Sequence, residues 1–260
     1  ILSGLVGSEM CIRDRNNAEL RSSGGIIGAI ALLHAENGRI TLVQQASVPD
    51  FPALETPIPL SESTVALFED RPGRYMQNLT SIPDFTEAGP AIAKRWQDRF
   101  GQPVDGVIAV DAVMTENLVA ATGPLAFGPF TATEDTVVDL LLSEIYAAVP
   151  DPLAQDEIFS QAAGALLSAA LTEADPKDLV AALSASADER RIRIWSAHED
   201  EEAILSASSL GGALPEDDTQ THVGVLLNDT TGGKMDFYAD ATITTLSLIH
   251  ISEPTRPERI

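Results

Sequence analysis

The alternation of apolar and polar positions predicts several strands. Residues 21–43 form a candidate β-hairpin: an apolar, glycine-punctuated run and an alternating run flank Glu36-Asn37-Gly38, a turn with a residue suited to positive φ. The apolar run VDGVIAVD, residues 104–111, is bounded by acidic residues, as is typical of a buried strand. Alternation also predicts strands at residues 191–197, 222–228 and 234–245, the last two joined by DTTGG.

A helical pattern follows Pro83. Ile92, Trp96 and Phe100 lie at four-residue spacing with charged residues between them, which predicts an amphipathic helix from Thr86, as its amino-terminal cap, to Phe100, with Gly101 ending it. The preceding residues 49–83 are rich in Pro, Ser and Asp and are expected to be mostly loop, with a short helix or strand near 63–68.

The remaining helices indicate the class of fold. Residues 113–121 are predicted to be a helix between strand 104–111 and a short strand, LAF, at 125–127, and a strand-helix-strand order indicates an α/β sheet. Thr133 is expected to cap the helix TVVDLLLSEIYAAV. Further helices are expected at 156–171, 177–187 and 199–209. The predicted fold is a single α/β domain with a mixed central sheet flanked by helices.

The two ends of the chain are interpreted as translated sequencing adapter. Residues 5–14, LVGSEMCIRD, and 246–256, LSLIHISEPTR, correspond to one common library adapter read in opposite orientations. We therefore expect residues 1–15 and 246–260 to be artefacts, and residues 16–245 to be the domain, a fragment of a longer gene product. The single cysteine, Cys11, then falls outside the domain, which excludes disulfide, thiol and thiolate-metal chemistry within it.

Charge excludes one class of function. The chain has 39 acidic and 16 basic residues, a net charge of -23, and each end segment contains as many acidic as basic residues, so the domain itself is strongly acidic. Nucleic-acid binding needs a surplus of Lys and Arg at the interface, so no nucleic-acid partner is expected.

Five separated blocks resemble one bacterial envelope family, the domain of unknown function 4012. They are NNAELRSSGGIIGAIALLHAENGRI, VDGVIAVDAVMTENLVAATGP, TEDTVVDLLLSEIY, RRIRIWSAHEDEEAIL and NDTTGGKMDFY, in that order. The resemblance implies an extracytoplasmic domain on a membrane anchor. The family is in turn distantly similar to the LytR-CpsA-Psr phosphotransferases, which move polyprenyl-pyrophosphate-linked glycopolymers onto the cell wall, and this implies a LytR-CpsA-Psr-like fold.

Arginines and one aspartate are the candidate site residues. Arg21 precedes Ser22-Ser23-Gly24-Gly25, and a guanidinium beside accessible backbone N–H groups suits phosphate. Arg71, Arg74, Arg95 and Arg99 are a local basic concentration that could line a phosphate pocket with it. Asp111, at the carboxyl end of a predicted strand, is a candidate base or Mg²⁺ ligand. The alternatives are that the arginines balance nearby carboxylates and that Asp111 caps the next helix.

Three functions are compatible with these observations. The first is an anchored, extracytoplasmic protein of cell-envelope or surface-polysaccharide organisation, with or without enzymatic activity. The second is a metal-assisted phosphotransferase acting on an anionic polyprenyl-linked glycan or wall polymer, with Arg21 and Asp111 as catalytic residues. The third is a protein-interaction module, which an exposed apolar patch without convergent charges would favour.

Overall fold

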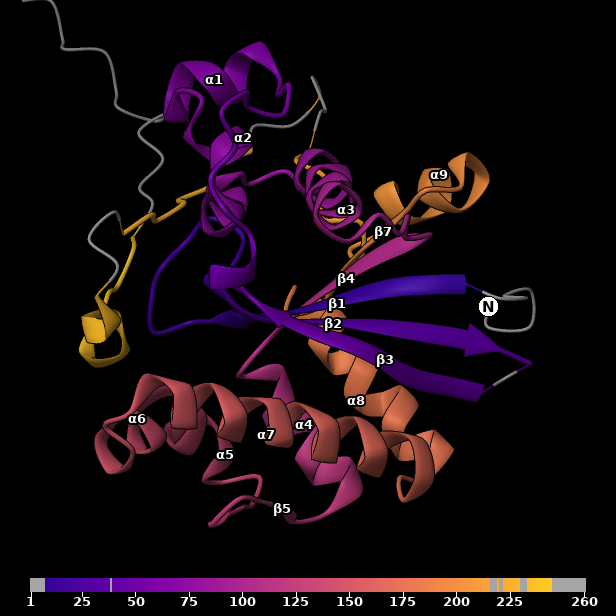
Figure 1. Cartoon of the computed structure of the whole chain (residues 1–260), viewed down its shortest axis with the longest axis vertical. Coiled ribbons are helices and arrows are strands. Elements are labelled where there is room, and N and C mark those ends of the chain that lie inside the picture. The colour runs from indigo at the N-terminus through magenta and orange to yellow at the C-terminus, as the bar shows by residue number, and fades with distance from the viewer. Residues whose placement is uncertain (1–7, 38, 216–218, 220–221, 230–232, 245–260) are drawn as a thin grey trace, which may run out of the picture.

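The computed structural model describes residues 8–37, 39–215, 219, 222–229 and 233–244. A five-stranded sheet in the order β3-β2-β1-β4-β7 lies between two layers of helices (Figure 1). Strand β1 pairs parallel with β4, whereas the β1-β2, β2-β3 and β4-β7 pairs are antiparallel, so the sheet is mixed as expected. The strands are β1 (Ser8–Asn16), β2 (Ile26–Glu36), β3 (Arg39–Ser47), β4 (Gly106–Asp111) and β7 (Arg193–Ser196).

One layer of helices lies above the sheet in Figure 1 and closes the main hydrophobic core. Ile30 and Leu32 of β2 and Val107 of β4 are fully buried there against Ile92 and Trp96 of α3. Complete burial of such a side chain stabilises a fold by about 1.5–3 kcal/mol. The elements of this layer are η2 (Val48–Asp50), α1 (Glu62–Phe68), α2 (Arg71–Arg74), η3 (Met76–Ser81), α3 (Phe85–Phe100) and α9 (Glu199–Ser206).

The second layer lies below the sheet and has a hydrophobic core of its own. Val119 of α4, Phe127 of β5 and Ile158 of α7 are among its buried residues. Its elements are α4 (Met114–Thr122), β5 (Leu125–Phe127), β6 (Phe130–Ala132), α5 (Val137–Asp139), the π-helical turn η4 (Leu140–Glu144), α6 (Ile145–Ala148), α7 (Pro152–Thr172) and α8 (Pro176–Asp188). Within the described residues, no helix combines the length and apolarity needed to cross a membrane.

Most predicted elements are confirmed. Strands β2 and β3 form the expected hairpin, and Asn37 in its turn has φ 52°, a conformation that asparagine tolerates well. Helix α3 ends at Gly101, which has φ 76°, as expected for a glycine cap. Its start differs from the prediction: Asp84 is the cap, and its Oδ1 accepts hydrogen bonds from the backbone N and the Oγ1 of Thr86. The Asp84 carboxylate takes the capping role because it accepts from the backbone N–H of Thr86, which has no acceptor within the helix.

Four expectations are wrong. The strand at 125–127 pairs with β6 in a separate two-stranded sheet, so residues 106–127 are not a crossover unit of the main sheet. The side chain of Thr133 does not cap a helix; its Oγ1 contacts that of Thr136, and the helix begins at Val137. Residues 222–228 belong to no strand of the described structure, and the region predicted as strand 234–245 begins with the 3₁₀ helix η5 (Lys234–Tyr238). A strand requires a partner, and alternation alone does not supply one.

The expected domain boundary after residue 15 falls inside β1. This strand occupies the centre of the sheet, and Cys11 is fully buried in it. The origin of residues 1–15 stays a prediction, and residues 246–260 lie outside the described part of the chain.

Candidate binding pocket

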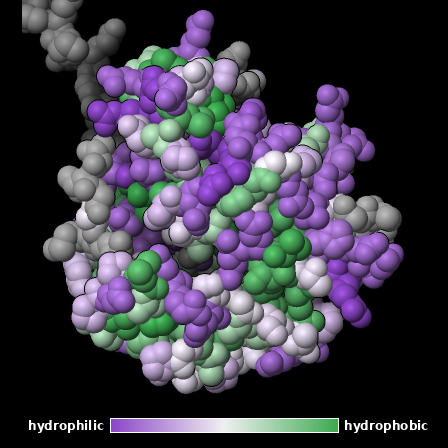
Figure 2. All heavy atoms as spheres, viewed as in Figure 1, coloured by the Kyte–Doolittle hydropathy of each residue, from purple (hydrophilic) through white to green (hydrophobic). Residues whose placement is uncertain are grey.

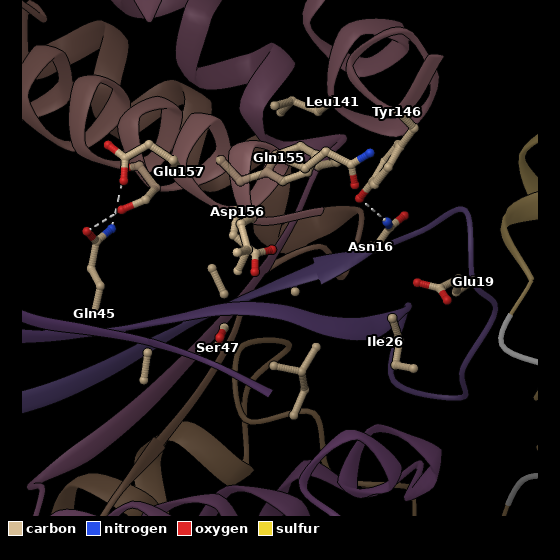
Figure 3. Close-up of a pocket in the computed structure, with 18 of the residues that line it drawn as sticks. Asn16, Glu19, Ile26, Gln45, Ser47, Leu141, Tyr146, Gln155, Asp156 and Glu157 are labelled. Carbon is tan, nitrogen blue, oxygen red and sulfur yellow. Dashed lines mark hydrogen bonds between the residues drawn. The ribbon is translucent and has the colours of Figure 1, made fainter. Parts of the chain in front are cut away.

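A pocket of about 470 Å³ lies between the sheet and the lower helical layer (Figure 3). Its floor is formed by the first residues of β2 and the last residues of β3, and its roof by η4, α6 and the first two turns of α7. The volume is within the range of about 300–1,000 Å³ that small-ligand pockets usually have.

The pocket exists because its floor is built from small side chains. Gly28 and Ala29 of β2 and Ala112 after β4 line it. These residues leave space that α7 bridges without filling, and Gly28 is consequently exposed in the middle of the sheet. The π turn η4 contributes Leu141 and Leu142 to the opposite wall. Such turns are uncommon and often lie at functional sites.

The polar groups of the lining are held in place by hydrogen bonds. Asn16 Nδ2 donates to the hydroxyl of Tyr146 at 3.0 Å (Figure 3). Gln45 Nε2 donates to the backbone carbonyl of Ser160 at 3.4 Å, and Gln45 Oε1 accepts from the Ser160 hydroxyl at 2.5 Å. Gln155 Nε2 donates to the carbonyl of Val149 at 2.6 Å, which leaves Gln155 Oε1 as an acceptor at the pocket.

Carboxylates are the other polar component of the lining. Asp156 lies over the strands at the centre of Figure 3, and among the described residues neither of its oxygens has a hydrogen-bond or ion-pair partner. Glu157 Oε1 accepts from Gln161 Nε2, and Asp50 Oδ2 accepts from the backbone N of Ser47. Glu19, 7% exposed, completes the set. The lining residues include no Arg or Lys.

Two aromatic rings stand beside these groups. Tyr146 and Phe159 pack with their ring centroids 5.2 Å apart and an interplanar angle of 43°, and both line the pocket. The site therefore combines an apolar surface with a set of hydrogen-bond acceptors.

Asp111 lies outside this pocket and is engaged in structural contacts. It is 3% exposed at the end of β4, and its Oδ1 accepts from the backbone N of Met114 at the start of α4. Its Oδ2 accepts from Asn17 Nδ2 at 3.1 Å and from Arg191 at 3.2 Å. Both oxygens are thus occupied and a guanidinium lies beside them, so these surroundings do not fit Mg²⁺. Across the described residues, no group of three or more His, Cys, Asp or Glu side chains is placed to hold a metal ion.

The loop after Arg21 has few backbone donors left for an anion. Ser22 N donates to Asn228 Oδ1, Ser23 N donates to the Thr80 carbonyl, and Gly24 N donates to the carbonyl of Arg21. Arg21 itself is 8% exposed and donates from one terminal nitrogen to the Leu20 carbonyl, while its Nε is buried without a partner in the described structure.

The basic cluster holds an irregular segment of backbone. Arg99 donates to the carbonyl of Asp50, Arg95 to that of Pro52, and Arg74 to those of Leu54 and Glu55. Arg71, whose side chain is 70% exposed, pairs with Glu69, and Arg74 also pairs with Asp70 at 2.7 Å. Burial lowers the pKa of Arg95, which nevertheless remains a cation. These arginines do not converge with Arg21 and Asp111 on the pocket.

Sequence reasoning missed the residues that surround Asp111. Arg15, 1% exposed, donates to the backbone carbonyls of Val110 and Arg191. Burial lowers the pKa of Arg191, but its pairs with Glu189 and Asp111 more than offset this, and the net pKa is raised. Burial and, secondarily, Arg190 lower the pKa of Arg193. Asp111 at the end of a predicted strand was the available signal, but its side-chain partners come from positions 17 and 191, far apart in sequence.

The protein is a mixed α/β domain with a pocket between its sheet and the lower helical layer. Residues 12–146 match the model of the family described as Protein of unknown function (DUF4012), and the chain belongs to that family. The match begins four residues before the expected domain start. No curated protein matches the chain.

Solved structures share the fold at low identity. Protein gbs0355 from Streptococcus agalactiae is 12% identical, with a TM-score of 0.51 over 81% of this chain and 76% of that one. TagV from Bacillus subtilis is 10% identical, with a TM-score of 0.42 over 79% and 80%. A LytR-Csp2A-Psr enzyme from Actinomyces oris is 12% identical, with a TM-score of 0.41 over 80% and 76%. The expected fold class is confirmed, and likenesses at this identity concern the fold alone.

Proposed function

We propose that this protein is an extracytoplasmic, membrane-anchored component of the cell envelope that binds a hydroxyl-rich glycan in the pocket under its sheet. The location and the anchor rest on the family resemblance and are part of the proposal. The observation that supports binding is the chemistry of the lining, in which acceptors and aromatic rings occur together without a cation.

Sugar hydroxyls are donors that suit such a lining. Gln155 Oε1 and the oxygens of Asp156 can each accept a hydroxyl hydrogen. The C–H face of a pyranose ring is apolar and can pack on the Tyr146–Phe159 pair. Because the amides of Asn16 and Gln45 are already fixed by hydrogen bonds, binding does not have to order them.

The phosphotransferase alternative has less support from the geometry. A pyrophosphate group needs cations or backbone donors within reach. The pocket offers carboxylates instead, and the arginines expected to bind phosphate hold backbone carbonyls elsewhere. We therefore favour glycan binding over phosphoryl transfer at this site.

One observation favours a second candidate function, protein interaction. Val223, Val225 and Leu226 are 71%, 51% and 48% exposed in a segment without regular secondary structure. Leu42 and Val43 are exposed on the edge strand β3, and Figure 2 shows hydrophobic patches on a face that is otherwise mostly polar. Extended apolar segments and open strand edges can pair with another chain. Cross-linking of the protein to its envelope neighbours from Val223→Cys tests this candidate.

Filling the pocket tests glycan binding. Gly28 lies in β2 at the pocket floor and has no positive φ, so Gly28→Val requires no left-handed backbone and adds a branched side chain to the lining. We expect isothermal titration with a β-1,4-linked N-acetylglucosamine tetramer to detect binding to the wild type. The variant should bind about tenfold more weakly or worse, since overpacking costs about 1–3 kcal/mol.

Thr41→Val is the matched control, because Thr41 is exposed on β3 and is not part of the lining. It should bind like the wild type. Equal affinities of the Gly28→Val and Thr41→Val variants would contradict binding in the pocket.

A further inference from the structure

The pocket is negatively charged as well as rich in acceptors. Glu19, Asp50, Asp156 and Glu157 line it, and no lining residue carries a positive charge. Like charges in a concave site focus the potential, so the pocket concentrates cations and repels anions. This feature goes beyond what a neutral glycan requires.

The available oxygens are distributed around the cavity. Asp156 has both of its oxygens open to a ligand among the described residues, and Glu157 Oε2 and Asp50 Oδ1 have no hydrogen-bond partner there either. Asp156 and Glu157 come from α7 in the roof, whereas Asp50 lies at the end of η2 beside the floor. Carboxylates therefore line the cavity on two sides.

The aromatic wall and the amides limit the shape of that cation. A bare metal ion makes no use of the Tyr146–Phe159 pair. A sugar ring that carries hydroxyl groups and an ammonium group can use the aromatic pair, the Gln155 oxygen and the carboxylates together. Its ammonium group has three donors for the carboxylates. The 470 Å³ of the cavity leave room for such a ring.

We propose that the pocket selects amino sugars with a free, protonated amino group over their N-acetylated forms. The ammonium group donates to Asp156, the ring hydroxyls donate to Gln155 Oε1, and the apolar ring face packs on Phe159. This inference rests on the proposed glycan binding and names its substrate class.

The test compares three probes by isothermal titration at a pH at which the amino groups are protonated. The probes are a β-1,4-linked glucosamine tetramer, the N-acetylglucosamine tetramer, and spermidine, which is a cation without a ring. The glucosamine tetramer should bind about tenfold more tightly than the N-acetylated one, the effect of one charge-assisted hydrogen bond. Added salt should weaken glucosamine binding and leave N-acetylglucosamine binding almost unchanged.

Asp156→Asn should remove most of this preference, and Asp178→Asn, an exposed charge on α8 outside the lining, should preserve it. Equal binding of the two tetramers by the wild type would overturn the inference and leave glycan binding intact. Absence of binding by both tetramers would overturn the proposed function as well. Spermidine binding as tight as that of the glucosamine tetramer would also overturn the inference, because it would indicate simple charge attraction.

Discussion

Replacing Asp111 with alanine distinguishes a structural carboxylate from a catalytic one. The side chain is 3% exposed, and it joins the start of α4, the Asn17 amide and the Arg191 guanidinium. Its loss removes three hydrogen bonds at the junction between β4 and the lower helical layer. We expect Asp111→Ala to lower the free energy of unfolding markedly.

The magnitude follows from the three contacts. The bond to Met114 N has the function of a helix cap, worth about 1 kcal/mol. The Asn17 bond contributes about 1 kcal/mol. The Arg191 pair contributes about 1 kcal/mol or less, because 31% of the arginine side chain remains exposed to solvent. The expected total is about 2–3 kcal/mol.

Urea unfolding followed by the fluorescence of the two tryptophans, Trp96 and Trp195, measures this change. Asp111→Asn is the matched variant: it retains an acceptor for Met114 N but loses the ion pair, and we expect it to lose about half as much stability. A loss below about 0.5 kcal/mol in Asp111→Ala would refute the structural role, and Asp111 would again be a candidate catalytic residue.

Two further predictions concern residues outside the pocket. Arg74→Met removes the donor for two backbone carbonyls and the partner of Asp70. It should lower the free energy of unfolding by about 1–2 kcal/mol and speed proteolysis within residues 52–58, while binding of the N-acetylglucosamine tetramer is retained. Unchanged cleavage would contradict this role. Burial raises the pKa of Glu202. Between the ordinary and the raised pKa, the folded state therefore binds more protons than the unfolded state. The contribution of Glu202 to stability falls as pH rises through that window. Glu202→Gln should therefore be more stable than the wild type above the window and equal to it below, in thermal melts at several pH values; a difference that does not change with pH would contradict this origin.

Elements with a strong local pattern could be predicted from the sequence. The β2-β3 hairpin follows from alternation around Asn37, and α3 follows from the four-residue spacing of Ile92, Trp96 and Phe100. In both, the residues that determine the structure are neighbours in sequence. The buried strand β4 could also be predicted, because its residues form a short apolar run bounded by acidic residues.

Pairing between distant segments could not be predicted in the same way. Residues 125–127 are apolar, but they pair locally with β6 in a separate sheet. Residues 222–228 alternate as a strand does, yet the fold places no strand beside them among the described residues. A pattern specifies which face of a strand is apolar and leaves its partner unspecified.

The pocket was inaccessible to sequence reasoning for a related reason. Its floor depends on Gly28 and Ala29, small residues that carry no chemical signal of their own. Its acceptors come from Gln155 and Asp156, on a helix more than 100 positions away. The arginines were conspicuous because the chain is acidic. In the fold they donate to backbone carbonyls, and such partners cannot be identified from a sequence motif.

Mapping the bound sugar by nuclear magnetic resonance tests the central claim most directly. The backbone amide signals of the ¹⁵N-labelled protein are followed during titration with the N-acetylglucosamine tetramer. We predict shifts at Gly28, Ala46, Tyr146 and Gln155, which surround the pocket, and none at residues 21–25. Shifts confined to residues 21–25 and to the neighbourhood of Asp111, with the pocket signals unchanged, would contradict the account.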